Sequence, residues 1–301
     1  MIRVNAERLW TTLEMMAQIG GTPAGGVTRL ALSEEDRIAR NLLRDWALEA
    51  GLTCDVDSMG NMFIRRAGTN PALAPVMTGS HVDSQPLGGN YDGIYGVLAG
   101  LELLRTLNDN NVQTERDIVL VNWTNEEGAR FAPAMLASGV WAGQLSEDFA
   151  YARMDSKRVT VREALEAIGY RGEIPARAFP VHACYELHIE QGPILEDESI
   201  DIGLVRAAMG QRWFTLALEG FAAHAGTTPM HSRRDALTAF AELALKVEEI
   251  GYRHAPDGRA TIGMAEIIPN SRNVVPSRVV CSVEFRHPEQ DALEAMEVAL
   301  H

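Results

Sequence analysis

The spacing of apolar residues predicts alternating helices and strands over the first two hundred residues. Apolar positions at helical spacing in 5–19 and 34–50 predict two amphipathic helices, and Ser33 and Gly51 mark the start and stop of the second. Short apolar runs predict buried strands. The further elements in chain order are a strand at 62–65, a strand at 75–80, a helix from the glycine-rich loop 88–93 to about Leu107, a strand at 117–123, a helix at 160–169 and a strand at 184–189. This alternation is typical of an α/β sheet covered on both faces.

The pattern changes near Gly210. Alternating residues predict a strand at 211–219, and the elements that follow are a helix at 234–252, strands at 260–268 and 277–286, and a helix from Pro288 onward. This β-α-β-β-α order is that of a ferredoxin-like α+β unit without its last strand. We therefore expect two domains, at 1–210 and 211–301.

Composition and charge narrow the function classes. The chain has 301 residues, and 27 basic against 41 acidic residues give a formal charge of −14, so neither nucleic acid nor an anionic membrane is an expected partner. No apolar stretch approaches the ~18 residues of a spanning helix, and the N-terminus has no signal-peptide core. Cys54, Cys184 and Cys281 are far apart and odd in number, which favours thiols in a reducing cytoplasm over a disulfide framework.

Histidine and carboxylate residues follow the predicted strand at 75–80. His81 and Asp83 are two residues apart and would point to one side of an extended chain, so the carboxylate can help to hold a ligating imidazole. Asp92 precedes the next helix, and taken alone it is more simply explained as a helix N-cap.

Two adjacent glutamates, Glu126 and Glu127, come directly after the strand at 117–123. Adjacent residues of a turn can point to different partners, so one can bind a metal while the other works as a general acid or base on water. A solvated acidic turn is the simpler alternative for any lone pair of glutamates.

The third cluster alternates along the last predicted strand of the first domain, where Glu186, His188 and Glu190 share a face. One such histidine is usually structural, but this set places histidines and carboxylates at several strand ends, where α/β sheets bind ligands. Imidazole and oxygen ligands without thiolate suit a hydrolytic zinc, manganese or cobalt site.

The second domain adds polar residues of another kind. His224 lies in a glycine- and threonine-rich loop at 220–230, and Asn273 and Arg286 lie beside apolar strands. An amide and a guanidinium suit an amide oxygen and a carboxylate of a small substrate. Taken singly, Asn273 is also explained as a turn residue and Arg286 as a surface salt bridge.

Five ordered strings of residues carry a family resemblance. They are Thr78-Gly-Ser-His-Val-Asp-Ser, Gly89-Asn-Tyr-Asp-Gly-Ile-Tyr-Gly, Asn125-Glu-Glu-Gly-Ala-Arg-Phe, Glu186-Leu-His-Ile-Glu-Gln-Gly-Pro and His224-Ala-Gly-Thr-Thr-Pro-Met. Together they resemble the M20 metallopeptidase-like amidohydrolases, in the branch of N-carbamoyl-L-amino-acid hydrolase, allantoate amidohydrolase and β-ureidopropionase. The resemblance implies a mixed-sheet, zinc-peptidase-like catalytic domain with an inserted smaller lid and dimerisation domain.

The resemblance also implies a two-metal reaction. His81 and His188 would hold one divalent ion, zinc or else manganese, cobalt or nickel. Asp92 would bridge to a second ion, which Glu127 binds, and Glu126 would be the general base. The reaction would be hydrolysis of the ureido or carbamoyl C–N bond of N-carbamoyl-L-amino acids or allantoate.

Five further roles follow from the resemblance. Asp83 would orient His81. His224 would stabilise the oxyanion, reaching the site of a partner subunit in a homodimer. Gln191, Asn273 and Arg286 would position the substrate, with Arg286 on its carboxylate.

One feature of the family is missing from the sequence. In the family the chain returns to the catalytic domain and supplies a last histidine ligand in a Gly-His-Asp-Ala-like motif, and neither His287 nor His301 has that context. We therefore expect a C-terminally truncated chain with an incomplete second metal site and weak or absent hydrolysis. The alternatives are an M20 dipeptidase or deacylase, which shares the ligands, and a catalytically impaired metal-binding fragment.

Overall fold

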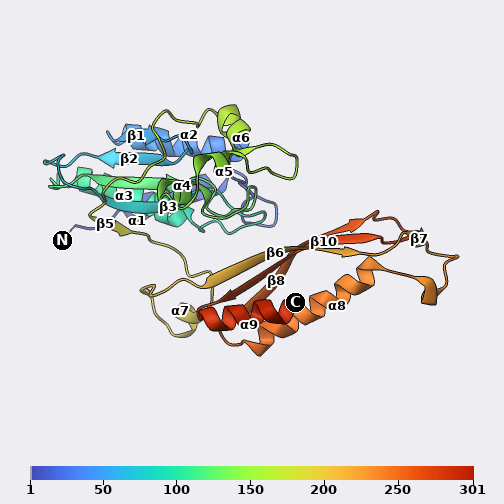
Figure 1. Ribbon diagram of the computed structural model, residues 1–301. Helices are drawn as coiled ribbons and strands as arrows, with labels where there is room; N and C mark the ends of the chain where they lie inside the picture. The colour runs from blue at the N-terminus through green and yellow to red at the C-terminus, as the bar shows by residue number, and fades with distance from the viewer. Residues whose placement is uncertain (1) are drawn as a thin grey trace. The chain divides into compact units, whose positions relative to one another are not determined.

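A mixed sheet of five strands organises the first of two units in the computed structural model, which describes residues 2–301 (Figure 1). The boundary between the units lies between Ser199 and Ile200. The strands are β1 (Thr53–Val56), β2 (Met62–Arg66), β3 (Val76–His81), β4 (Ile118–Trp123) and β5 (Ala183–Tyr185). Their order is β1-β2-β4-β3-β5, with β3 parallel to both of its neighbours and the β1–β2 hairpin antiparallel. The parallel strands therefore end at the same edge.

The first unit also contains the helices that the periodicity predicts, and those at 6–17, 34–49 and 94–109 pack on the sheet. The helices of this unit are α1 (Ala6–Ala17), α2 (Glu34–Glu49), α3 (Ile94–Asp109), α4 (Leu136–Trp141), α5 (Glu147–Tyr151), α6 (Val161–Ile168) and α7 (Ile194–Asp197). The predicted cap of α2 is confirmed, because the Ser33 hydroxyl accepts a hydrogen bond from the Asp36 N–H. The short helices α4, α5 and α7 were not predicted, since one or two turns carry little periodicity.

Both faces of the sheet are buried, as predicted. Ile64 and Leu120 pack with α1, α2 and α3 on one face. Val119 and Val121, the neighbours of Leu120, point to the other face and pack there with an aromatic group that includes Phe179. Each fully buried side chain of this size contributes about 1.5–3 kcal/mol, so the sheet forms a firm base for the loops at its edge.

The strand predicted at 184–189 is wrong in length, because β5 ends at Tyr185. β5 is an edge strand that pairs with β3 only over three residues. Beyond it, Glu186 contacts β3 through its side chain, which accepts a hydrogen bond from Ser80 Oγ at 2.5 Å. Glu190 accepts hydrogen bonds from backbone N–H groups at the start of α7, so its side chain stabilises a turn and not a strand.

The second unit, described here over Ile200–His301, has the predicted β-α-β-β-α order. Its three-stranded antiparallel sheet has the order β6-β10-β8. The elements are β6 (Gly210–Glu219), β7 (Ala223–His224), η1 (Met230–Ser232), α8 (Ala236–Arg253), β8 (Arg259–Ile268), β9 (Val274–Val275), β10 (Arg278–His287) and α9 (Gln290–Leu300). Alternate residues of β10, including Val283 and Phe285, are buried against α8 and α9.

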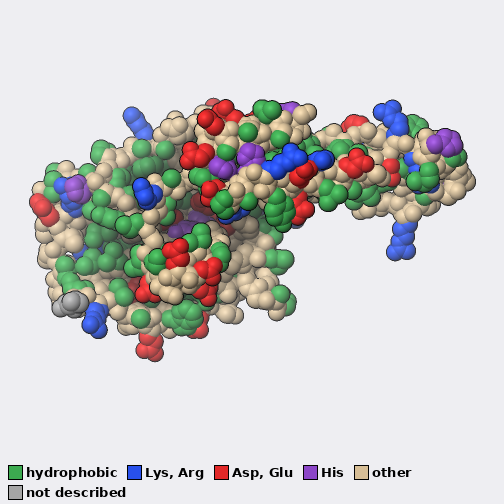
Figure 2. Space-filling view, turned by 90° about the horizontal axis from the view of Figure 1, so that it is seen from below, with side chains coloured by type: hydrophobic (Ala, Val, Ile, Leu, Met, Phe, Trp, Pro, Cys, Tyr) green, Lys and Arg blue, Asp and Glu red, His purple; other side chains and the backbone are tan. Residues whose placement is uncertain are grey.

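Two further observations concern the charged side chains of the surface and the hydropathy of the helices. Figure 2 shows acidic and basic side chains interspersed on the face of the molecule that it draws. Within residues 2–301, no helix combines the length and the apolar character that crossing a membrane requires.

Candidate metal and catalytic site

The carboxyl ends of β3, β4 and β5 bring the predicted histidines and carboxylates of the first unit together. His81, Asp92 and His188 each offer a ligand atom, and these atoms lie within 4.8 Å of one another. His188 Nε2 is 3.3 Å from Asp92 Oδ1, and His81 Nε2 is 3.9 Å from the same oxygen. One divalent ion could therefore contact all three residues.

Each imidazole is held through its other ring nitrogen. His81 Nδ1 donates to the backbone carbonyl of Asp83, and His188 Nδ1 donates to the backbone carbonyl of Ile189, both at 2.8 Å. A carbonyl only accepts, so each Nδ1 carries a proton, and Nε2 is the ring atom that faces Asp92 and can ligate a metal. This arrangement is usual for histidines that bind metals.

Gly93 leaves the space that the His81 ring occupies. A Cβ on Gly93 would stand 2.3 Å from His81 Nε2, and the backbone φ there is +64°. Gly93 is also the N-cap of α3, and no described side chain caps that helix. The simpler explanation of Asp92 as a helix cap is therefore wrong, and its carboxylate is directed to the histidines instead.

The two glutamates lie in a turn that Asp83 holds. The buried Asp83 carboxylate accepts hydrogen bonds from the N–H groups of Glu126 and Glu127, at 3.2 and 3.3 Å. The same carboxylate lies 4.0 Å from His81 Nδ1, so the contact expected from the Asp83 side chain is made by its backbone carbonyl. Glu126 Oε2 lies 3.4 Å from His81 Nε2, beside the three-residue cluster.

The charges in this cluster favour a bound cation. Burial, together with neighbouring carboxylates, raises the pKa of Glu126 and Glu127. Without a bound metal, the hydrogen bond that His188 donates to the Asp92 carboxylate outweighs burial and raises the pKa of His188 to about 9. The buried Glu127 Oε1 has no hydrogen-bond partner among the described residues. Several carboxylates and an orphaned buried oxygen beside two oriented imidazoles fit a divalent metal.

Gln191 and Gln85 also contact the carboxylates of the cluster. Gln191 Nε2 donates to Asp92 Oδ2, so the predicted substrate residue lies at a metal-ligand candidate. Gln85 Nε2 donates to Glu127 Oε2 at 3.0 Å. No sequence pattern pointed to Gln85, since a glutamine in a loop has no characteristic neighbours.

The remaining predicted site residues belong to the second unit. The Asn273 backbone carbonyl accepts a hydrogen bond from the Ala225 N–H at 2.9 Å, which places Asn273 next to His224 in the β7–β9 ribbon. Arg286 lies near the other end of β10, and its Nε donates to Glu284 Oε1 at 2.6 Å. Within this unit, the structure thus brings His224 and Asn273 together and leaves Arg286 apart from them.

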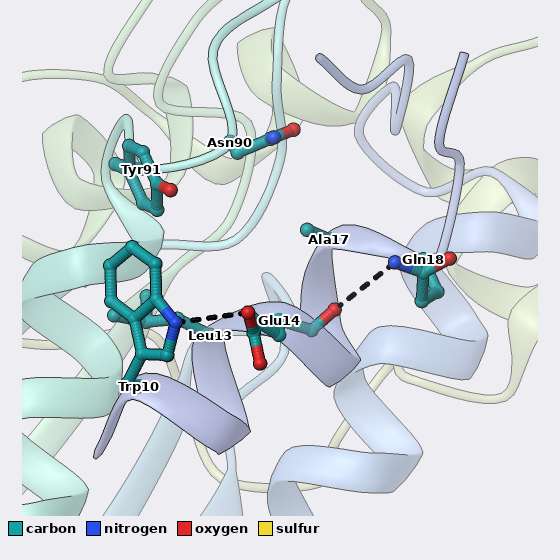
Figure 3. A pocket seen from close by; sticks show the side chains of 7 residues that line it. All are labelled: Trp10, Leu13, Glu14, Ala17, Gln18, Asn90 and Tyr91. Atoms are coloured by element: carbon teal, nitrogen blue, oxygen red, sulfur yellow. Dashed lines mark hydrogen bonds between the residues drawn. The ribbon is translucent and has the colours of Figure 1, made fainter. Parts of the chain in front are cut away.

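A hollow of about 400 Å³ lies between α1 and the loop before Asp92 (Figure 3). The Trp10 and Tyr91 rings are 5.9 Å apart, and Trp10 Nε1 donates to Glu14 Oε1 at 2.9 Å. The described residues that line it are Trp10, Leu13, Glu14, Ala17, Gln18, Asn90 and Tyr91. No metal-ligand candidate is among them, so this hollow is distinct from the cluster.

The chain is similar to a peptidase family and to several amidohydrolases. Peptidase family M20/M25/M40 matches residues 77–290. The chain is 47% identical to an N-carbamoyl-L-amino-acid amidohydrolase of Rhizobium meliloti, over 98% of this chain and 71% of that protein. It is 37% identical to an allantoate amidohydrolase of Bacillus subtilis, over 94% and 69%. A hydantoinase/carbamoylase family amidase from Burkholderia vietnamiensis superimposes with a TM-score of 0.97 at 53% identity, over 99% of this chain and 72% of that one.

Proposed function

The chain belongs to peptidase family M20/M25/M40, and on that premise we propose that it hydrolyses the carbamoyl or ureido C–N bond of N-carbamoyl-L-amino acids or allantoate. The observation that carries the proposal is the cluster of His81, Asp92 and His188 with Glu126 beside it. The amidohydrolase relatives support the substrate class, which the cluster alone leaves open.

The geometry of the first unit supports the metal ligands in this proposal. His81, His188 and Asp92 would hold one divalent ion, and Asp92 and Glu127 would contribute to a second. A bound divalent metal polarises a carbonyl oxygen and lowers the pKa of water. Imidazole and carboxylate donors accept zinc, manganese, cobalt and nickel, so the metal is identified by its content in the purified protein.

Glu126 is the general base in this proposal. Its carboxylate stands next to His81 without belonging to the three-residue cluster, so it remains free to accept a proton from the attacking water. It then returns that proton to the leaving nitrogen as the C–N bond breaks. Burial raises the pKa of Glu126, which brings the carboxylate closer to the value that suits a base near neutral pH.

Residues of the second unit would bind the substrate. Arg286 would form a bidentate pair with the substrate carboxylate, exchanging its present contact with Glu284. The His224 imidazole would stabilise the negative oxygen that develops on the carbamoyl carbon, and Asn273 would bind the substrate amide. Gln191, which belongs to the first unit, would also position the substrate.

The spacing within the second unit supports a homodimer. Arg286 stands eight residues along β10 from Arg278, about 26 Å at 3.3 Å per residue. Arg278 pairs with Glu219, five residues before His224. A carbamoyl amino acid is no longer than a dipeptide, about 7 Å, so one substrate cannot contact Arg286 and His224 of the same copy. We therefore assign His224 and Asn273 to the site of a partner subunit.

Ammonia release tests the proposal directly. The chain loaded with zinc, manganese or cobalt is incubated with N-carbamoyl-L-amino acids, with allantoate and with simple dipeptides. We expect weak ammonia release from the ureido compounds, its loss after chelation and dialysis, and its recovery when metal is added back. Cleavage of dipeptides alone would support the peptidase alternative instead. Metal content per chain distinguishes a two-metal centre from a single ion at His81, Asp92 and His188.

A further inference from the structure

A fully buried ion pair lies behind the glutamate turn. Arg40 and Asp36 stand one turn apart on α2, both side chains have no solvent exposure, and Arg40 Nε donates to Asp36 Oδ1 at 2.8 Å. The other Asp36 oxygen accepts a hydrogen bond from the Leu32 N–H. Removing two charges from water is costly, and apolar residues of similar volume often hold a helix equally well. The pair alone therefore does not explain why a guanidinium stands here.

The remaining donors of the guanidinium reach two loops. Arg40 Nη1 donates to the Gly60 carbonyl at 2.7 Å, and Nη2 donates to Thr124 Oγ1 at 3.2 Å. Thr124 directly follows β4 and precedes Glu126 by two residues. Its own N–H donates to Asn61 Oδ1 at 3.0 Å. Thr124 is thus fixed through both its side chain and its main chain at the point where the glutamate turn begins.

We propose that Arg40 is a positioning residue for Glu126 and acts through Thr124; this inference rests on the proposed role of Glu126 as the base. The planar guanidinium fixes the directions of its hydrogen bonds, which a lysine ammonium does not. Asp83 holds the Glu126 and Glu127 N–H groups from inside the same turn. The turn is therefore anchored at its start by Arg40 and at its centre by Asp83, and the Glu126 carboxylate is placed without being touched by either.

Paired substitutions of Thr124 test this role. Thr124→Val removes the hydroxyl and keeps the shape, and Thr124→Ser keeps the hydroxyl. Thr106→Val is the matched control, because Thr106 is equally buried and its hydroxyl donates to Glu102 within α3. We expect Thr124→Val to lower kcat about tenfold or more with KM and metal content unchanged, since small displacements of a catalytic group are costly. The kcat of Thr124→Ser and of Thr106→Val should remain close to that of the parent.

Arg40→Lys provides a second variant with the charge retained. A lysine can still pair with Asp36 but cannot also reach both the Gly60 carbonyl and Thr124 Oγ1 in fixed directions. We expect the same fall in kcat as for Thr124→Val. A thermal melt of each variant shows whether it remains folded at the assay temperature.

Amide hydrogen exchange tests the inference without any activity. The Glu126 and Glu127 amides donate to Asp83, so a loosened turn exposes them. We expect faster exchange of these two amides in Thr124→Val and Arg40→Lys, and parent-like exchange in Thr106→Val. Unchanged exchange in both variants, or an equal fall in kcat in Thr106→Val, would overturn the proposal. A parent without ureido hydrolysis would refute the proposed function, whereas the exchange data would still decide whether Arg40 orders the turn.

Discussion

At the scale of single residues, the site depends on which atom of each imidazole faces Asp92. His81 and His188 both donate from Nδ1 to a backbone carbonyl, so the main chain determines the tautomer before a metal binds. This preorganisation also requires space for the His81 ring. The His81 ring lies where a side chain on Gly93 would stand, so the glycine is as necessary to the cluster as the ligands.

Gly93→Ala should therefore weaken metal binding. The added Cβ would contact His81 Nε2 and would also hold alanine at a positive φ. We expect metal affinity to fall at least about tenfold, as for other changes that displace a ligating histidine. Metal titration of the metal-free chain measures the effect. Gly89→Ala is the control, because a Cβ at Gly89 meets no described atom within 4 Å. Equal affinity of the two variants would contradict this requirement for space.

The substitution Glu126→Gln distinguishes the proposed roles of Glu126 and Glu127. The amide keeps the size of the side chain but cannot accept the proton, so we expect kcat to fall by about 10²-fold or more. Metal content should remain that of the parent, because Glu126 lies outside the three-residue cluster. Elemental analysis and ammonia release give the two readouts, with the exposed Glu115→Gln as control. Loss of metal in Glu126→Gln would show that the roles of Glu126 and Glu127 are reversed.

At the scale of elements, the sequence predicted those helices and strands that carry their own periodicity. α2 has an apolar stripe and a serine cap, and β4 has an apolar run, so both were predicted nearly to the residue. β5 was predicted too long because Glu186, His188 and Glu190 alternate with apolar residues. That alternation reflects separate contacts with Ser80, Asp92 and the start of α7, and not a ladder of backbone bonds.

For the candidate site too, the sequence predicted residues that follow a local pattern and missed those that depend on tertiary packing. The histidines and acidic residues of the cluster were predicted because they follow the ends of predicted strands. Parallel strands bring such residues together at the carboxyl edge of the sheet, where ligands bind. Arg40 and Asp36 were missed because an arginine four residues after an aspartate is also the pattern of a solvated surface pair on a helix. Only the packing of α2 against the loops at Gly60 and Thr124 distinguishes the two.

The turn between β1 and β2 gives the stability of the fold a pH dependence. Asp57 accepts hydrogen bonds from the N–H groups of Met59 and Asn61 and from the Asn61 amide. Burial outweighs these bonds and raises the pKa of Asp57 to about 6. In the unfolded chain the pKa is about 3.9. The folded state thus binds the proton more tightly, so Asp57 destabilises the fold above pH 6, and this cost disappears as the pH falls toward 4.

Asp57→Asn removes this titration. Between pH 7 and pH 5 the parent should gain about 1 kcal/mol of unfolding free energy that the variant does not gain. The stability difference, parent minus variant, should therefore increase by that amount, and urea unfolding of both proteins at each pH measures it. Because other titrating groups are common to both proteins, they cancel in the difference. A difference that stays constant with pH would show that Asp57 remains ionised in the fold.

At the scale of the whole molecule, we propose that the site would take residues from two copies of the chain. Glu126 and the metal ligands belong to the first unit, whereas His224 and Asn273 lie in the β7–β9 ribbon of the second. Arg286 lies about 26 Å along β10 from Arg278, at the end of the strand that follows the ribbon, at roughly 3.3 Å per residue. In a dimer with twofold symmetry each copy would give its ribbon to the other, so both sites would be equivalent.

Mixing two inactive variants tests this exchange. Homodimers of Glu126→Gln lack the base at both sites, and homodimers of His224→Ala lack the oxyanion residue at both. If His224 serves the partner, a mixed dimer has one site with both defects and one site with none. Random subunit exchange makes about half of the dimers mixed, so about a quarter of the parent activity should return. If His224 serves its own copy, every site of a mixed dimer retains one defect, and mixing restores nothing.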